Sequence, residues 1–160
     1  MIHIKIITVG KLKENYLRDA CAEYEKRLKR YADVSMIELP DEAVKENASD
    51  AECNEAVKKE GQRILSKILE KDYCIGLFID GRKLSSETFS KEIDKLQTEG
   101  NSDVCFIIGG SNGLSLEVEK RCDKKISFSD MTFPHQLMRV ILLEQIYRAF
   151  KIIKNEPYHK

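Results

Sequence analysis

The stretch Phe128-Ser-Asp-Met-Thr-Phe-Pro-His-Gln-Leu-Met-Arg139 determines how the C-terminal part of the chain is organised. It joins a short apolar segment to a long apolar helix, and Pro134 suits the first turn of that helix because its missing N–H is not needed there. Upstream, Ile107-Ile-Gly-Gly-Ser-Asn-Gly-Leu114 reads as a strand that ends in a glycine loop. The sequence closes on Pro157-Tyr-His-Lys160, at a position where chains usually fray. These segments suggest a small-molecule site built from loops at strand ends, with a polar tail beside it.

Strand-like and helix-like segments alternate along the chain. Alternating or continuous apolar runs predict strands, and apolar residues at helical spacing predict helices. The predicted strands span 2–9, 34–39, 73–79, 103–108 and 126–128, and the predicted helices span 12–31, 53–69, 85–96, 113–122 and the segment from Pro134 onward. Asp80-Gly81 reads as a turn, and residues 41–55, acidic and without periodicity, read as a mobile loop or a frayed helix start.

This alternation predicts the fold class. Central strands that are apolar throughout indicate an α/β fold in which a mostly parallel sheet is covered by helices on both faces. In such sheets ligands bind beyond the carboxyl ends of the strands. Three loops meet that description here, after residues 77–79, after Ile108 and after Phe128.

The long C-terminal helix carries two apolar stripes. One is formed by Met138, Ile141, Leu142, Ile146, Ala149 and Ile153, and the other by Leu137, Val140, Leu143, Tyr147 and Phe150. A helix that packs on one sheet needs only one stripe. The second stripe suggests contact with another subunit, most simply in a two-fold dimer. The alternative is a helix buried centrally within one chain.

Bulk properties exclude several classes of protein. A chain of 160 residues is long enough for one domain with a full core and too short for two ordinary ones. Its 27 basic and 27 acidic residues cancel, so binding to a polyanion would need a local patch or an oligomer. The five scattered cysteines include no CxxC pair and no histidine at ligand spacing. With neither a membrane span nor a signal-peptide pattern, we expect a cytoplasmic protein without a structural metal.

Two loops have the composition of a ligand site. Gly109-Gly110-Ser111-Asn112-Gly113 would let the backbone approach a ligand closely, although such clusters also form simple turns. The spacing is neither GxGxxG nor that of a P-loop, which disfavours a dinucleotide or nucleoside triphosphate. Residues 128–133 mix aromatic, thioether and hydroxyl groups, which suits an adenine-sized apolar slot. The same composition would also serve a loop that packs its own side chains.

The histidines and the basic residues near the C-terminus are candidates for chemistry. His3 lies in a strand and reads as structural, whereas His135 could cap a helix, pack or bind. His159 could act as a general base if it is held in place, or could simply be solvated. A basic cluster could bind phosphate, above all if a dimer doubled it, or could be a solvated helix face; it comprises Arg139, Arg148, Lys151, Lys154, His159 and Lys160. A second basic run, Lys26-Arg27-Leu28-Lys29-Arg30, could also be solvated.

Taken together, the motifs resemble one known family. They are Thr8-Val-Gly-Lys-Leu-Lys13, Tyr24-Glu-Lys-Arg-Leu28, Glu60-Gly-Gln-Arg-Ile-Leu65, the glycine loop through Leu114, the segment 128–139, Glu144-Gln-Ile-Tyr-Arg-Ala149 and Pro157-Tyr-His-Lys160. Their joint spacing, over essentially the whole chain, is similar to that of the ribosomal RNA large subunit methyltransferase H family, which belongs to the SPOUT class. Residues 41–55 match only loosely.

The resemblance implies a fold and an activity. It implies one SPOUT methyltransferase domain over residues 1–160, an α/β knot whose C-terminal segment forms a trefoil. It also implies a homodimer that acts on assembled ribosomes and methylates N3 of a pseudouridine in a 23S rRNA hairpin loop near the decoding centre. S-adenosylmethionine would lie in the knot, and the residues implied to contact it are Leu77, Gly109, Phe128, Ser129, Asp130, Met131, Thr132 and Phe133.

The chemistry of that reaction assigns roles to the C-terminal residues. The N3 of pseudouridine is an imide nitrogen that must lose its proton, which calls for a base and for stabilisation of the developing charge. We assign His159 as the base or its orienting group, Tyr158 as a stacking or hydrogen-bonding partner, and Arg139 as a stabiliser of the anion. The residues expected to contact RNA are Lys160, Arg148 and His135.

Three other functions compete with this interpretation. The first is a non-catalytic RNA- or ribosome-binding module, which would leave both ligand loops without a purpose. The second is a nucleotide-dependent enzyme of Rossmann type, which the glycine spacing disfavours. The third is methylation of another RNA, such as transfer RNA, on the same scaffold.

Overall fold

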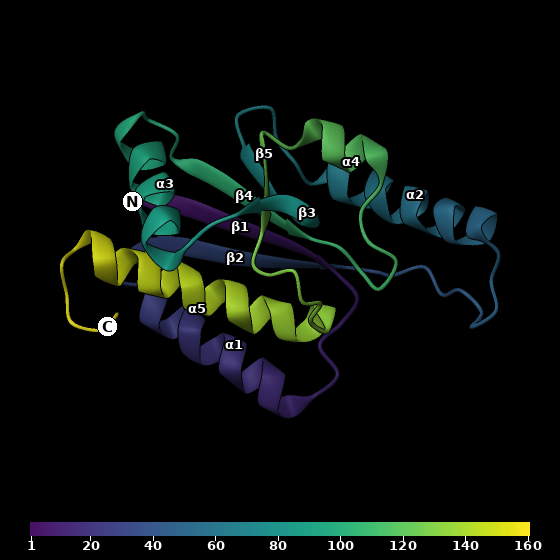
Figure 1. Ribbon diagram of the computed structural model, residues 1–160, viewed down its shortest axis with the longest axis horizontal. Helices are drawn as coiled ribbons and strands as arrows, with labels where there is room; N and C mark the ends of the chain where they lie inside the picture. Colours follow the sequence, from purple (N-terminus) through teal and green to yellow (C-terminus); the bar gives the residue numbers. More distant parts are fainter.

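The computed structural model describes all residues, 1–160, and contains alternating strands and helices (Figure 1). In chain order they are β1 (Ile2–Val9), α1 (Asn15–Leu28), β2 (Ala32–Leu39), α2 (Asp50–Ser66), β3 (Tyr73–Lys83), α3 (Ser86–Thr98), β4 (Asp103–Ile108), α4 (Leu116–Arg121), β5 (Lys124–Ser127) and α5 (His135–Ile153). The predicted alternation is confirmed.

The five strands form one sheet in the order β2-β1-β4-β3-β5, and every pairing is parallel. One apolar cluster joins the sheet to α1, α3 and α5, and a second joins the opposite face to α2 and α4. Figure 1 shows α1 and α5 side by side, with α2 and α4 apart from them. The predicted parallel sheet with helices on both faces is therefore confirmed. The carboxyl ends of its strands share one edge, as parallel strands require.

Helix α2 begins earlier than predicted. Ser49 accepts a hydrogen bond from the N–H of Glu52 (3.2 Å), and the Glu52 carboxylate reaches back to the N–H of Ser49 (3.5 Å). This reciprocal capping box satisfies two donors that a helix start leaves free. The prediction of a loop or frayed helix start is wrong for residues 50–52, because the acidic residues there suit the first turn of a helix, whereas residues 53–55 belong to the predicted helix.

The turn predicted at Asp80-Gly81 is also wrong. Strand β3 continues to Lys83 through an irregularity in its pairing with β5, where the register shifts between Leu77 and Arg82. A Cβ atom at Gly81 would lie 2.5 Å from the carbonyl carbon of Ile126. Glycine at this position therefore permits close approach of two strands rather than a turn.

The second apolar stripe of α5 is covered within the chain. Leu143 and Phe150 are buried, and the Phe150 ring stacks on Tyr31 at 5.6 Å and 7°. Tyr147 packs against Tyr24 of α1, with ring centroids 6.2 Å apart. The inference that this stripe meets another subunit is wrong for these residues, because α1 already covers them. For Leu143, Tyr147 and Phe150 the structure contains the alternative, a helix covered within one chain, whereas Leu137 at the start of the stripe is exposed.

Several further features bear on function. No helix combines the length and apolarity needed to cross a membrane. No group of three or more His, Cys, Asp or Glu side chains could hold a metal ion, and all five cysteines are free thiols. The trefoil path of the C-terminal segment stays a prediction.

Close packing of α2 on α4 depends on Gly61, which yields the first testable prediction. A Cβ atom there would lie 3.0 Å from Cβ of the buried Ser115 and closer still to its Oγ. We expect Gly61→Ala to lower the free energy of unfolding by about 1–3 kcal/mol, because added volume strains a packed interface. Urea unfolding would measure this. Asn54→Ala, on an exposed position of the same helix, should leave stability unchanged or slightly higher; equal effects of the two changes would contradict the prediction.

Candidate functional site

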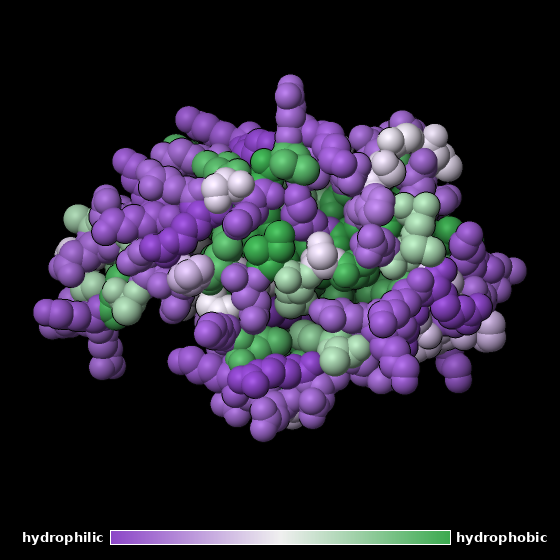
Figure 2. Space-filling model, turned by 180° about the vertical axis from the view of Figure 1, so that it is seen from behind, coloured by the Kyte–Doolittle hydropathy of each residue, from purple (hydrophilic) through white to green (hydrophobic).

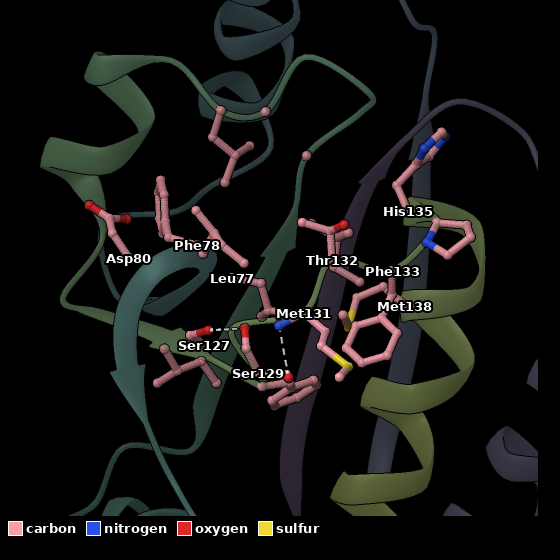
Figure 3. A pocket seen from close by; sticks show the side chains of 18 of the residues that line it. Leu77, Phe78, Asp80, Ser127, Ser129, Met131, Thr132, Phe133, His135 and Met138 are labelled. Carbon is pink, nitrogen blue, oxygen red and sulfur yellow. Dashed lines mark hydrogen bonds between the residues drawn. The ribbon is translucent and has the colours of Figure 1, made fainter.

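The three loops chosen from the strand ends border one cavity of about 500 Å³ (Figure 3). Leu77 comes from β3, Gly109 follows β4 and Phe128 follows β5, while the first turn of α5 closes the remaining side with His135 and Met138. The cavity size lies in the range of small-molecule sites, which are commonly concave and largely apolar. The carboxyl edge of this sheet therefore holds a preformed site.

Glycines shape the wall of the cavity that follows β4. A Cβ atom at Gly109 would lie 2.9 Å from the carbonyl carbon and oxygen of Gly113, and Gly113 itself has a φ of +85°. A bridge between Gly110 and Gly113 closes the turn. The cluster thus makes a tight turn and borders the cavity at the same time, so the two interpretations of this loop are compatible.

Hydroxyl groups fix the wall that follows β5. The Ser127 hydroxyl donates to the carbonyl of Ser129 (3.0 Å), and the Ser129 hydroxyl accepts from the N–H of Met131 (3.0 Å). Figure 3 shows both bonds at the base of the cavity. Met131 is 75% exposed and Phe133 is 37% exposed. These two apolar side chains line the cavity and are not buried in the hydrophobic core.

Of the six predicted residues in 128–133, all but Asp130 line the cavity. The Asp130 carboxylate points to solvent and pairs with Lys83 at 2.5 Å. Asp130 does not line the cavity, because the turn that Ser129 fixes directs residue 130 outward, and its contact with the cofactor stays a prediction.

Several lining residues were missed from the sequence; they include Phe78, Asp80, Leu114, Pro134 and Met138. Phe78 and Asp80 were overlooked because the Asp-Gly pair was interpreted as a turn after the strand. Figure 3 shows the Asp80 carboxylate across the cavity from His135. Met138 could have been found from its spacing, one helical turn after His135.

Arg139 is fully buried, and its guanidinium is already hydrogen-bonded within the chain. Its guanidinium donates to Glu38 (2.6 Å) and to the carbonyls of Gly10 (2.6 Å) and Val9 (3.2 Å), while its Nε has no partner. These contacts tie the ends of β1 and β2 to α5. In this chain Arg139 positions loops rather than facing the cavity, and its assigned role on an anion stays a prediction.

His135 lies at the cavity beside this arginine. Burial lowers the pKa of its imidazole from the ordinary value of 6.5, and the nearby charge of Arg139 lowers that pKa further. The ring is therefore neutral at neutral pH. It presents a hydrogen-bonding group to the cavity rather than a charge.

The C-terminal tail is docked on α5. The Tyr158 ring packs edge-on against Tyr147 at 4.9 Å, and the Arg148 guanidinium lies over the Tyr158 ring at 4.7 Å. The Tyr158 hydroxyl donates to Glu144 (3.1 Å), which also pairs with Arg148 (2.5 Å). Burial and the Glu144 carboxylate raise the pKa of Tyr158 to about 12, so the hydroxyl keeps its proton.

His159 is held through both ring nitrogens. Nδ1 lies 3.1 Å from Arg148, and Nε2 lies 2.7 Å from Glu87 of α3. A guanidinium can only donate, so Nδ1 must accept, and Nε2 must carry a hydrogen that it donates in a hydrogen bond to the Glu87 carboxylate. The hydrogen bond from His159 holds the pKa of Glu87 below its usual value. Lys160, next to this clamp, is exposed.

The cavity and the tail are separate in one chain. Met138 at the cavity and Arg148 at the tail are ten residues apart on α5, or about 15 Å at 1.5 Å per residue. Figure 1 shows the C-terminus at the far end of α5 from the start of that helix. The predicted residues therefore fall into two groups. One lines the cavity, and the other, with Tyr158, His159 and Arg148, surrounds the tail.

Comparison with known proteins agrees with this architecture. The model of a family described as "Predicted SPOUT methyltransferase" matches residues 2–159 of this chain. In fold alone, the chain is similar to a probable methylase family protein from Haemophilus influenzae Rd KW20, with a TM-score of 0.54 and 12% identity over 99% of this chain and 70% of that one. The class is therefore that of the SPOUT methyltransferases.

Relatives that match over their full length identify the family within this class. The chain is 55% identical to the ribosomal RNA large subunit methyltransferase H 1 of Clostridium perfringens (strain SM101 / Type A). It is 56% identical to the ribosomal RNA large subunit methyltransferase H of Listeria welshimeri and to that of Bacillus thuringiensis (strain Al Hakam). Each match covers 99% of this chain and 100% of the relative. The chain belongs to the ribosomal RNA large subunit methyltransferase H family.

The anchoring role of Arg139 yields the second prediction. We expect Arg139→Gln to lower the free energy of unfolding by about 2–4 kcal/mol, because it leaves buried carbonyls and Glu38 without their partner. Chemical denaturation would measure this. Arg82→Gln removes a largely exposed arginine whose nearest acid is 3.9 Å away, and should change stability by less than about 0.5 kcal/mol. Unchanged stability of Arg139→Gln would refute the anchoring role.

Proposed function

We propose that this chain transfers a methyl group from S-adenosylmethionine to 23S rRNA of the large ribosomal subunit, at N3 of a pseudouridine in the assembled ribosome. The observation that carries the proposal is the 55–56% identity, over essentially full length, to relatives named for methylation of that RNA. Residues 1–160 would act as one domain in the cytoplasm. The C-terminal segment would follow the trefoil path of the SPOUT class.

The cavity fits the methyl donor in size and chemistry. Apolar side chains and a glycine wall without Cβ atoms suit a purine with its sugar, while backbone groups near Gly109 and Ser129 offer hydrogen bonds at the rim. Leu77, Phe128 and Met131 would hold the apolar part. When bound, S-adenosylmethionine supplies a methyl group activated by its sulfonium. No metal is needed for such a transfer, which depends mainly on positioning.

The tail supplies the remaining groups. The imide N3 must lose a proton before it is a nucleophile, and His159 is the assigned base. Its Nδ1 is the nitrogen without a proton, and it becomes available only when the contact with Arg148 opens. Tyr158, protonated and ringed by Arg148 and Tyr147, would stack on or hydrogen-bond the base. Lys160 and Arg148 would contact phosphates, and His135 would contact RNA at the cavity.

A homodimer would bring the two groups together. The separation of about 15 Å along α5 between the cavity and the tail suggests that each cavity is completed by the tail of a second copy. Apolar side chains remain exposed for such an interface: Figure 2 shows a group of them in the middle of one face, and the large exposed residues include Tyr16, Met131, Phe133 and Leu137. Both observations support the proposed dimer.

Methyl transfer tests the activity and the role of His159. Labelled methyl from S-adenosylmethionine should enter methylpseudouridine, most with assembled ribosomes lacking the modification and least with naked rRNA. His159→Ala should lower the rate by about 100-fold or more, in line with loss of a general base, while S-adenosylmethionine affinity changes little. His3→Ala is the matched control, because His3 is exposed and its side chain has a hydrogen bond only with Asp33.

Unchanged turnover of His159→Ala would remove this residue from the mechanism. Binding of S-adenosylmethionine without label in any ribosomal sample would redirect the search to other RNAs, including transfer RNA. Failure to bind S-adenosylmethionine would favour a non-catalytic RNA-binding module.

Mixing two inactive variants tests the shared site. Gly109→Ala damages the cavity, because the added Cβ would meet the Gly113 backbone, and His159→Ala damages the tail. If tails act on the partner's cavity, a mixed dimer has one intact site. Random exchange should then restore about one quarter of wild-type activity, since half of the dimers are mixed and each has one of two sites. If each tail served its own chain, the mixture would stay inactive.

A further inference from the structure

The C-terminal ends of α1 and α5 meet and form a basic surface, of which the proposed function uses only Lys160. We call it the α1–tail surface; its exposed cations are Lys26, Lys29, Arg30, Lys154 and Lys160. The Tyr31–Phe150 stack and the hydrogen bond from the Tyr31 hydroxyl to Glu156 (2.9 Å) fix one helix end on the other. The basic run at the end of α1 is therefore held beside the tail.

The acidic groups of this region, except Glu25 on α1, have ion-pair partners within the chain. Glu23 pairs with Arg27 (3.0 Å), Glu156 pairs with Lys151 (2.9 Å), and Asp33 at the start of β2 lies 3.1 Å from His3. None of the five cations of the α1–tail surface has an acidic side chain within 4.0 Å. In a chain with no net charge, this surface is thus a local excess of positive charge. A local positive patch of this kind is what binding to a polyanion requires in a chain whose net charge is zero.

Aromatic rings lie beneath one cation of the surface, Arg30, and beneath the two paired cations beside it, Arg27 and Lys151. Arg30 lies over the Tyr31 ring at 5.5 Å, and Lys151 lies over the same ring at 5.8 Å. Arg27 lies over the Tyr24 ring at 5.2 Å and over the Tyr147 ring at 5.6 Å. A freely solvated helix face would not need such rings beneath its charges. Positioned cations lose less conformational entropy when they bind an anion.

The surface lacks the features of a protein or membrane contact. No cluster of large exposed apolar residues lies on it: Tyr16 is at the opposite end of α1, and near this end there is only Met1, next to the Ile2–Ala32 pair. Protein interfaces are centred on apolar or aromatic anchors, and membrane-surface helices insert an apolar face. Charge without an apolar anchor instead suits the phosphate backbone of a nucleic acid.

We propose that the α1–tail surface binds phosphates of the RNA that flanks the target nucleotide and guides that strand to the tail. The inference rests on the proposed function. Phosphate contacts set register and orientation without reading sequence. Lys26 lies in the last turn of α1, Lys29 caps that helix and Arg30 follows it, so the three charges gather at its C-terminal end. That end lies beside the segment that carries Tyr158 and His159.

A triple substitution tests the surface. Lys26→Gln, Lys29→Gln and Arg30→Gln together remove three charges outside the cavity and the tail clamp. Lys58→Gln, Lys59→Gln and Lys120→Gln form the matched control, because these exposed lysines lie on α2 and α4, on the other face of the sheet. Methyl transfer to ribosomes is measured for wild type and both variants at several salt concentrations, with S-adenosylmethionine affinity and melting temperature determined in parallel.

We expect the α1 variant to raise KM for ribosomes by about 10- to 100-fold, while kcat, S-adenosylmethionine affinity and melting temperature stay near those of wild type. The slope of log affinity against log salt should fall in magnitude by about 2, at roughly 0.7–0.9 for each phosphate that the variant no longer neutralises. The control variant should match wild type in both quantities.

Three results would overturn the proposal. One is a wild-type KM and salt slope in the α1 variant, and another is an equal loss in the control variant. The third is weaker binding to intact ribosomes with unchanged binding to protein-free rRNA, which would identify a ribosomal protein as the partner. If wild type transfers no methyl, the proposed function fails. Sedimentation with ribosomes then compares the same variants, and equal binding rejects the surface.

Discussion

A single buried guanidinium holds the functional edge of this molecule together. Arg139 on α5 donates to Glu38 at the end of β2 and to the carbonyls of Val9 and Gly10 at the end of β1. Glu38 also accepts from the N–H of Leu12, so the connection that enters α1 belongs to the same network. The start of α5 cannot shift without disturbing two strand ends. Because that start forms one wall of the cavity, the shape of the cavity depends on this charge.

The fold was predictable where the local sequence determines the outcome. Apolar runs such as 103–108 can only be covered strands, and Ser85 caps α3 as its position before an acidic first turn predicts. The errors arose where distant backbone decides. Gly81 reads as a turn residue, but the proximity of Ile126 keeps it in a strand. The spacing of Ser49 and Glu52 is that of a capping box and could have been recognised in the sequence. It was missed because the surrounding segment is acidic and shows no helical periodicity.

The candidate site was likewise predictable where it depends on local sequence and not where it depends on distant contacts. The lining from 128–133 follows from the rule that ligands bind at carboxyl ends of parallel strands, and the outward turn of Asp130 depends on hydrogen bonds that composition does not reveal. The role of Arg139 could not be derived, because its partners lie 101 to 130 residues earlier in the chain. The clamp on His159 uses Glu87, 72 residues away. Long-range polar contacts of this kind leave no periodic signal.

The pairing of β1 with β4 has a consequence for how the chain is made. His3 is aligned with Asp103 in the central pair of the sheet, so β1 has only β2 beside it until about a hundred further residues have been added. At the usual speed of synthesis, roughly 5–20 residues per second, that interval lasts on the order of 5–20 s. During it, one edge of a strand in which five of eight residues are apolar has no partner, and such edges pair readily with other chains. The central position that protects β1 in the finished protein therefore exposes it to aggregation during biogenesis.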